Sequence, residues 1–272
     1  MNRRNFIKSV GAVAALGAVG LEQVSCSVSG TQKKAMKPFR VKATGSNFER
    51  EPLLRPFGFK GGYLTELWQS AFMLQGESGM RKIGICTHNV LWSDAEVFAA
   101  HSPAAGDAIM FAISNRGLQM IKDQTFESPV HMVECIKDEL WEYGKRITCN
   151  PYLRKTFVLN ALVGVDNAAW LLHAAENGIN RFDDLIPADY CSALSYRHDK
   201  VASIPLMAYA IPVSEIVQAV NDGYFFMKIK IGQPGTQEEM LQKDMDYYDR
   251  SGGIFEPSPH YEEWFMTANN SV

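Results

Sequence analysis

The order of short apolar strands and helices in the last third of the chain most constrains its fold. Residues 204–210 have the pattern of a buried strand, and Pro212 stands at the start of a helix over residues 213–221. A second apolar strand follows within residues 225–232, and a second helix over residues 237–249. Strand, helix, strand and helix in this order are typical of a parallel sheet with crossover helices. The sequence therefore predicts the opening of a parallel α/β architecture.

The second of these strands carries two lysines, Lys228 and Lys230, in a Lys-x-Lys-x-Gly pattern that ends at Gly232. Alternate residues of a strand share a face, so both amines point the same way, with Ile229 opposite them. Two ammonium groups held close disfavour each other's charge, which lowers the pKa of a lysine in such a pair. A lysine of this kind is suited to be a general base. The alternative is a solvated lysine face on an ordinary strand.

The preceding part of the chain predicts an α+β arrangement. Strand patterns cover residues 39–51, the stretch from Gly62 to Leu74, and residues 83–92, with a turn at residues 76–79. Helical patterns follow at residues 95–100, 108–122, 129–143 and 156–177. On the last helix, Asp166 and Asn167 are interpreted as structural residues that satisfy backbone groups. The 46% hydrophobic composition is sufficient for a sizeable core.

Three segments together resemble one protein family. Residues 160–170 are similar to the long helix that closes its capping domain, residues 203–209 to its first barrel strand, and residues 225–232 to its second. The family is the enolase superfamily, in the branch of mandelate racemase, muconate lactonizing enzyme and the dipeptide epimerases. The resemblance runs from about Phe39 to about Arg250. It implies an α+β capping domain, a three-stranded meander plus helices, over residues 38–200. The first βαβα units of an incomplete (β/α) barrel, the start of a TIM-like barrel, would follow at residues 201–250.

The resemblance also implies an activity, that of a racemase, epimerase or other isomerase, or of a lyase. In the family, a lysine at the position of Lys230 removes the proton alpha to a carboxylate, and Mg2+ holds the enediolate that forms. Lys228 would then be the neighbour that tunes the base.

The capping domain of the family provides specificity through a mobile loop between its first two strands. By resemblance this loop runs from Arg50 to Lys60. Its cations would steer an anionic substrate and its aromatic rings would close over it. The candidate substrate-binding residues are Arg50, Arg55, Phe57, Phe59 and Lys60. An ordinary exposed loop is the alternative.

The metal site of the family is not predicted in this chain. Its carboxylate ligands lie on barrel strands three to five, whereas the 70 residues from Ser203 to Val272 are far fewer than the ~250 of a complete barrel. Residues 251–272 form an aberrant tail without strand or helix periodicity. We therefore expect a C-terminally truncated, inactive relative that binds no metal, whereas intact relatives need Mg2+ and form homo-oligomers. Whether a frameshift caused the truncation stays open. A non-catalytic exported protein that binds a ligand or a partner is the alternative function.

The N-terminal segment predicts export. Residues 3–8 resemble a twin-arginine signal, an apolar stretch follows to Leu21, and Cys26 is a candidate lipid anchor. A signal peptide over residues 1–30, a polar linker over residues 31–37 and a periplasmic location are therefore expected. A net charge of −3 without a basic run argues against nucleic acid as a partner. The other cysteines have no Cys-x-x-Cys spacing, so buried thiols are the default expectation, with periplasmic disulfides as the alternative.

Overall fold

The computed structural model describes residues 36–59, 62–196, 198–208, 211–224, 227–233 and 235–250. The predicted signal peptide with Cys26, most of the predicted linker, Lys60 and the tail from Ser251 lie outside these residues, and so does the side chain of Phe59. The export signal, the lipid anchor and the periplasmic location therefore stay predictions.

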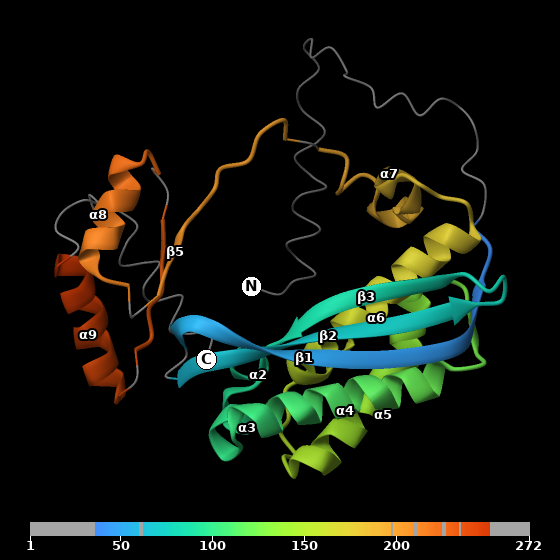
Figure 1. Cartoon of the computed structure of the whole chain (residues 1–272), viewed down its shortest axis with the longest axis horizontal. Helices are drawn as coiled ribbons and strands as arrows, with labels where there is room; N and C mark the ends of the chain where they lie inside the picture. The colour runs from blue at the N-terminus through green and yellow to red at the C-terminus, as the bar shows by residue number, and fades with distance from the viewer. Residues whose placement is uncertain are drawn as a thin grey trace, which may run out of the picture. The chain divides into compact units, whose positions relative to one another are not determined.

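An antiparallel sheet of four strands organises residues 36–188. It contains β1 (Phe39–Phe59), β2 (Gly62–Gly76), β3 (Arg81–His88) and β4 (Thr125–Phe126), in the order β3-β2-β1-β4 (Figure 1). The first three strands form the predicted meander. The sequence analysis missed β4, because two residues that pair with Phe39 and Arg40 have no periodicity of their own.

Strand β1 is longer than predicted and replaces the expected mobile loop. Its pairing with β2 shifts register between Pro52 and Phe57 and then resumes, with Phe57 opposite Leu64 and Phe59 opposite Gly62. Proline cannot donate to a ladder, so the prolines at positions 52 and 56 favour an irregularity there. The residues assigned to a loop instead extend the hairpin around this irregularity, because their partners on β2 continue.

Helices follow β3 along the chain, with β4 between α4 and α5: α2 (Val90–Ser93), α3 (Ala95–Ala100), α4 (Pro103–Ile121), α5 (Pro129–Thr148), α6 (Lys155–Glu176) and α7 (Phe182–Leu185). The predicted N-cap Asp94 accepts hydrogen bonds from the backbone N–H groups of Glu96 and Val97. The third strand was predicted to extend to Trp92, but it ends at His88. The Asn89 side chain accepts from the Trp92 N–H and thereby starts α2.

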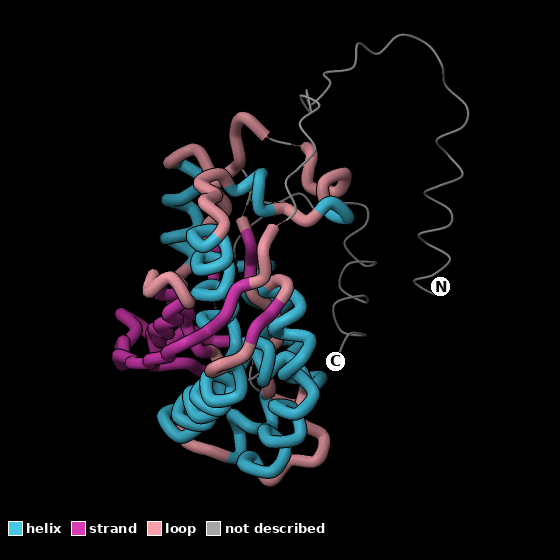
Figure 2. Tube along the Cα trace, turned by 90° about the vertical axis from the view of Figure 1, so that its right-hand side faces the viewer, coloured by secondary structure: helices cyan, strands magenta, loops and turns pink. Residues whose placement is uncertain are grey.

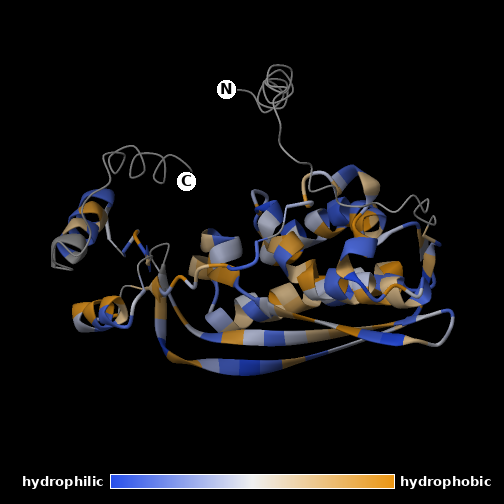
Figure 3. Ribbon diagram, turned by 90° about the horizontal axis from the view of Figure 1, so that it is seen from above, coloured by the Kyte–Doolittle hydropathy of each residue, from blue (hydrophilic) through white to orange (hydrophobic). Residues whose placement is uncertain are grey.

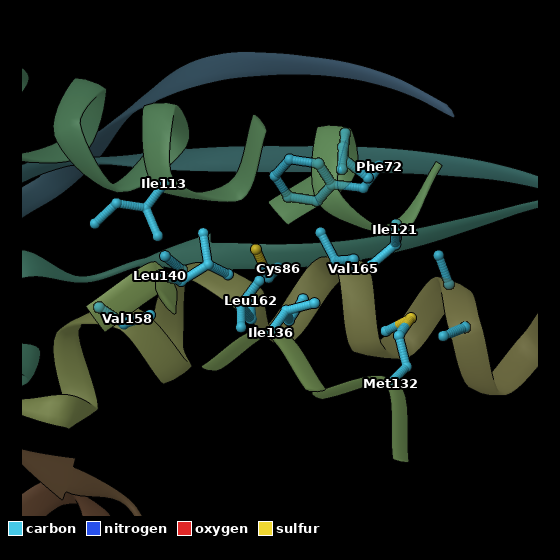
Figure 4. Close-up of a cluster of buried hydrophobic side chains, with 14 of the residues drawn as sticks. Phe72, Cys86, Ile113, Ile121, Met132, Ile136, Leu140, Val158, Leu162 and Val165 are labelled. Carbon is cyan, nitrogen blue, oxygen red and sulfur yellow. The ribbon is translucent and has the colours of Figure 1, made fainter. Parts of the chain in front are cut away.

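Helices α4, α5 and α6 cover one face of the sheet, as Figures 1 and 2 show. The strands alternate polar and apolar residues (Figure 3), and the helix-facing side chains of β2 are buried. Phe72 on β2 belongs to one buried cluster with Ile113, Leu140 and Leu162, which come from the three helices (Figure 4). Helix α6 is long and apolar enough to span a membrane, but it is mostly buried in this core, so these properties are weak evidence for a span.

Asn167 and the cysteines were expected to have structural roles. The Asn167 side chain donates to the backbone carbonyl of Ile85 at 3.0 Å, which is the structural role predicted for it. Cys86 is buried, as expected for a free thiol, whereas Cys135 and Cys149 are exposed. Exposure of these two thiols corrects the expectation that the cysteines are buried.

A parallel β-α-β unit lies in the last part of the chain. Strands β5 (Leu206–Met207) and β6 (Lys228–Ile229) pair in parallel, are joined through α8 (Val213–Asn221), and are followed by α9 (Gln237–Arg250). Among the described residues, these strands cover less than the predicted ranges 204–210 and 225–232, whereas α8 has the predicted bounds. Met207, Ile229 and the α8 residues Ile216 and Ala219 form a small core of their own. The order strand, helix, strand and helix agrees with the prediction.

Residues 189–196 belong to a separate small unit. A 3-10 turn at Ala188–Tyr190 is followed by a hydrogen bond from the Leu194 N–H to the Tyr190 carbonyl. The predicted boundary between a capping domain and a barrel at residue 200 stays a prediction.

Candidate functional site

The two lysines lie on one face of β6. The Lys228 N–H donates to the Pro205 carbonyl at 3.0 Å, and the Lys230 N–H donates to the Met207 carbonyl at 2.8 Å. Their side chains therefore share a face of the strand, while Ile229 packs with the α8 residues on the other face. Lys228 is exposed and Lys230 is half-buried. The structure thus places both lysines on the face away from α8, with Lys230 directly after the last residue of β6.

The chain that leaves β6 is held against α9. Gly232 has a φ of 89°, a conformation that favours glycine, and its N–H donates to Oδ2 of Asp244 at 2.6 Å. Thr236 and Glu239 begin α9 with a capping box. The Thr236 N–H donates to the Glu239 carboxylate at 2.9 Å, and the Glu239 N–H donates to the Thr236 hydroxyl at 3.3 Å. The segment after Lys230 is therefore fixed by local sequence signals.

Arg50, a predicted substrate-binding residue, is engaged within the four-stranded sheet. Its guanidinium donates to both carboxylate oxygens of Glu66, at 3.2 and 2.7 Å. This pairing lowers the pKa of Glu66. Arg50 lies opposite Trp68 in the register of β1 and β2, and Trp68 is buried beneath the helices. Arg50 therefore holds a carboxylate of its own chain on the helix-facing side of the sheet.

A second carboxyl group, Asp107 on α4, belongs to the same cluster. Its residue is 3% exposed, and burial together with the charge of Glu66 raises the pKa of Asp107 to about 7. The positive charge of Arg50 acts in the opposite direction. A group that titrates near neutral pH beside an arginine and a second carboxylate marks this cluster as electrostatically unusual.

Arg55 connects β1 with α8. Its guanidinium donates to the two carboxylate oxygens of Glu215, both at 3.0 Å. This pairing lowers the pKa of Glu215 and raises that of Arg55. The ion pair borders a cavity of about 370 Å³, which Met207 and Tyr224 also line. Lys228 and Lys230 are not among the residues that line this cavity, so Arg55 meets the β-α-β unit away from the lysine pair.

We expect the Arg55–Glu215 pair to hold α8 against β1. Substitution R55Q or E215Q should each increase amide hydrogen exchange in residues 213–221, and the double variant should exchange no faster than either single one. Hydrogen exchange followed by mass spectrometry of this peptide is the measurement. The side chains are 51% and 48% exposed, so we expect little change in global stability. Additive increases in the double variant would contradict the coupling.

The other predicted substrate residues have different surroundings. Phe57 is half-buried and packs in a small cluster with Leu64 and Leu91, which favours an anchoring role. Phe59 is described only through its backbone pairing with Gly62, and Lys60 lies outside the described residues.

The sequence analysis missed four acidic residues at these positions: Glu66, Asp107, Glu215 and Asp244. Asp107 had a detectable signal, because it is a single charge within an apolar helical stretch. The other three have no signal in the sequence, because their partners are distant along the chain or belong to the backbone.

The described residues do not fit the Mg2+ that the resemblance implies. Among them, no three His, Cys, Asp or Glu side chains come together in a way that would hold a metal ion. Mg2+ requires oxygen ligands, chiefly the carboxylates of Asp and Glu. We therefore derive no chemical step through a metal in this chain.

The chain was compared with known proteins. No protein-family model matches it, and no curated protein matches it. Among solved structures, L-talarate/galactarate dehydratase from Salmonella typhimurium LT2, with Mg and L-lyxarohydroxamate, has a TM-score of 0.47 and 14% identity. The match covers 88% of this chain and 54% of that one.

Two further solved structures are similar at the same level. A mandelate racemase/muconate lactonizing enzyme-like protein from Rubrobacter xylanophilus has a TM-score of 0.47 and 14% identity, covering 75% of this chain and 48% of its own. A dipeptide epimerase from Enterococcus faecalis V583 has a TM-score of 0.45 and 14% identity, covering 76% and 49%. These structural neighbours come from the branch that the sequence resembles, and the chain spans about half the length of each.

Proposed function

We propose that this chain carries the substrate-capping domain and the base-bearing strand of an enzyme that removes the proton alpha to a carboxylate. Lys230 is the proposed base, and Lys228 is the neighbour whose charge keeps more of the Lys230 amine neutral. The racemase, epimerase and lyase reactions named by the sequence resemblance share this first step. The substrate class is therefore a small-molecule carboxylate.

One observation carries this proposal: the lysine pair lies on the face of β6 away from α8. In a (β/α) barrel the helices form the outer ring, so the face away from the helix is the one that lines the interior. Active sites of such barrels lie at the C-terminal ends of the strands, and Lys230 directly follows the last residue of β6. A solvated lysine face on an ordinary strand would not need the parallel neighbour that β5 provides.

The capping domain contributes the proposed substrate contacts. Arg55 is proposed to steer an anion toward the β-α-β unit, because its guanidinium reaches from β1 to α8. For Arg55 to bind a substrate carboxylate, that carboxylate must replace Glu215 as its partner. Arg50, Phe57, Phe59 and Lys60 complete the proposed set. For Arg50 to bind a substrate carboxylate, that carboxylate must replace Glu66 as its partner.

We also propose that the 272-residue chain is exported, by a twin-arginine signal, and is inactive by itself. The missing metal-ligand set among the described residues supports inactivity, since enediolate formation from a carboxylate needs a strong electrophile. Mg2+ binding and homo-oligomer formation are proposed for intact relatives, and a lipid anchor is proposed at Cys26. A non-catalytic binding protein is the second candidate function. The missing metal-ligand set among the described residues is compatible with it as well.

The base assignment is tested by the reactivity of the Lys230 amine. Only a neutral amine reacts with an acylating reagent, so we expect K228M to slow acetylation of Lys230 at pH 8 by about tenfold, equivalent to one pKa unit. Peptide mass spectrometry after trace labelling gives the rate. The matched control is K228R, which keeps the positive charge and should leave the rate within about twofold. Equal rates in K228M and K228R would contradict the assignment.

The inactivity is tested by solvent-deuterium exchange. We expect the purified chain, with Mg2+, to introduce no more deuterium at the alpha carbon of acid sugars or dipeptides than its K230M variant does. Exchange that depends on Lys230 would refute the inactivity and support the base. Exchange that persists in K230M would refute the base. Saturable binding of a carboxylate without exchange, unchanged by K230M, would favour the non-catalytic binding protein.

A further inference from the structure

Asp244 on α9 is a buried carboxyl group that the proposed function does not yet use. Its residue is 7% exposed, and its Oδ1 is buried without a hydrogen bond of normal length among the described residues. Burial raises the pKa of Asp244, and the N–H of Gly232 opposes this shift. Burying a carboxyl group is costly, so a helix that needed only packing would favour an apolar residue at this position.

The hydrogen bond of Asp244 lies two residues beyond the proposed base. Oδ2 accepts from the Gly232 N–H at 2.6 Å, whereas the Lys230 N–H is held by the Met207 carbonyl at 2.8 Å. The backbone is thus fixed on both sides of Ile231. A second tie follows, because the side-chain amide of Gln233 donates to the Lys243 carbonyl at 3.2 Å.

These ties fix the turn by which the chain leaves β6. Gly232 adopts a positive φ, which requires the chain to change direction directly after Lys230 and Ile231. If the turn relaxed, the backbone of Lys230 would no longer be held at both ends, and its amine would move relative to Lys228. The spacing of the two amines decides how strongly each disfavours the charge of the other.

We propose that Asp244 is a positioning residue for Lys230. Its oxygen holds the Gly232 N–H, and through that turn it keeps the Lys230 amine beside Lys228 at the end of β6. This inference rests on the proposed function, because it assigns Asp244 to the base of that same site. Asp244 is not proposed to contact the substrate or the reacting atoms.

The test compares two substitutions of Asp244 in the full chain by acetylation of Lys230 at pH 8. D244A removes the acceptor and should slow the labelling of Lys230 by about tenfold relative to Lys137 on α5, an internal reference. D244N removes the charge but keeps an oxygen at the same place, so it should label within about twofold of the parent. D246A, on the same helix and exposed, is the matched control and should also stay within about twofold of the parent.

The outcomes separate positioning from stability and from charge. A D244N chain that loses as much reactivity as D244A would overturn the proposal, and so would a D244A chain that keeps the parental rate. If D244A disorders α9, as shown by hydrogen exchange of residues 237–246, D244N decides: the parental rate supports the proposal, and a changed rate overturns it. If K228M slows the acetylation of Lys230 but D244A does not, only the positioning role of Asp244 is overturned. If K228M leaves the acetylation rate of Lys230 unchanged, the proposed function is overturned. Asp244 is intact in that chain, so the two failures can be told apart.

Discussion

Replacing Gly84 with alanine is expected to lower the free energy of unfolding by about 3 kcal/mol or more. A Cβ atom at this position on β3 would overlap the carbonyl oxygen of Gly164 and the backbone nitrogen of Ala168 on α6. These are backbone atoms of a buried helix, which cannot rotate away as a side chain can. The helix would have to move off the sheet, with loss of the packing between α6 and β3. Chemical denaturation followed by circular dichroism measures the change.

The matched control is G45A on strand β1, which β2 separates from β3. There the added methyl group would meet only the Met73 side chain, at 3.4 Å from its Cε and 3.8 Å from its Cβ. We expect a change within about 0.5 kcal/mol, as for most substitutions that create neither a cavity nor an overlap. If G84A and G45A destabilise the chain equally, α6 does not cross β3 at Gly84 and Gly164.

Local sequence signals predicted the parts of the fold that depend on neighbouring residues. Asp94 caps α3 and Pro212 precedes α8, and both helices have the predicted bounds. The predicted strand over residues 39–51 ends before β1 does, because the continuation to Phe59 depends on pairing with Leu64 and Gly62, which no local pattern records.

The candidate site shows the same division between local and distant information. The Lys228–Lys230 pair was predicted because alternation along a strand is a local property. The partners of the arginines were not predicted, because Glu66 is 16 residues from Arg50 and Glu215 is 160 residues from Arg55. An exposed arginine in a predicted loop has no sequence feature that reveals an ion pair within its own chain.

Replacing Asp107 with asparagine is expected to make the chain more stable at pH 8 and to leave its stability nearly unchanged at pH 4. The pKa of Asp107 is about 7 in the folded chain and 3.8 in the reference state. Between these values the unfolded chain releases a proton that the folded chain retains, so rising pH favours unfolding. The stability that the neutral carboxyl group provides is complete below pH 3.8 and is lost as the pH rises through 7. Asparagine has nearly the same shape and never ionises, so it avoids this loss.

The expected gain follows from the difference between the two pKa values. At 1.36 kcal/mol per unit it amounts to about 4 kcal/mol at pH 8 as an upper value. Urea denaturation of both chains at several pH values between 4 and 8 measures it. D138N replaces an exposed carboxyl group on α5 and should show no such pH dependence.

Glu66 offers a second variant that identifies the cause of the shift. Its negative charge raises the pKa of Asp107, so E66Q should move the loss of stability toward lower pH. Burial is the larger cause, and E66Q leaves it in place, so part of the pH dependence should remain. Parallel stability curves for the parent and D107N from pH 4 to 8 would show that Asp107 is ionised at neutral pH in both states. Arg50 would then balance two carboxylates, and its proposed exchange of Glu66 for a substrate carboxylate would leave Glu66 on β2 and Asp107 on α4 without that balancing charge.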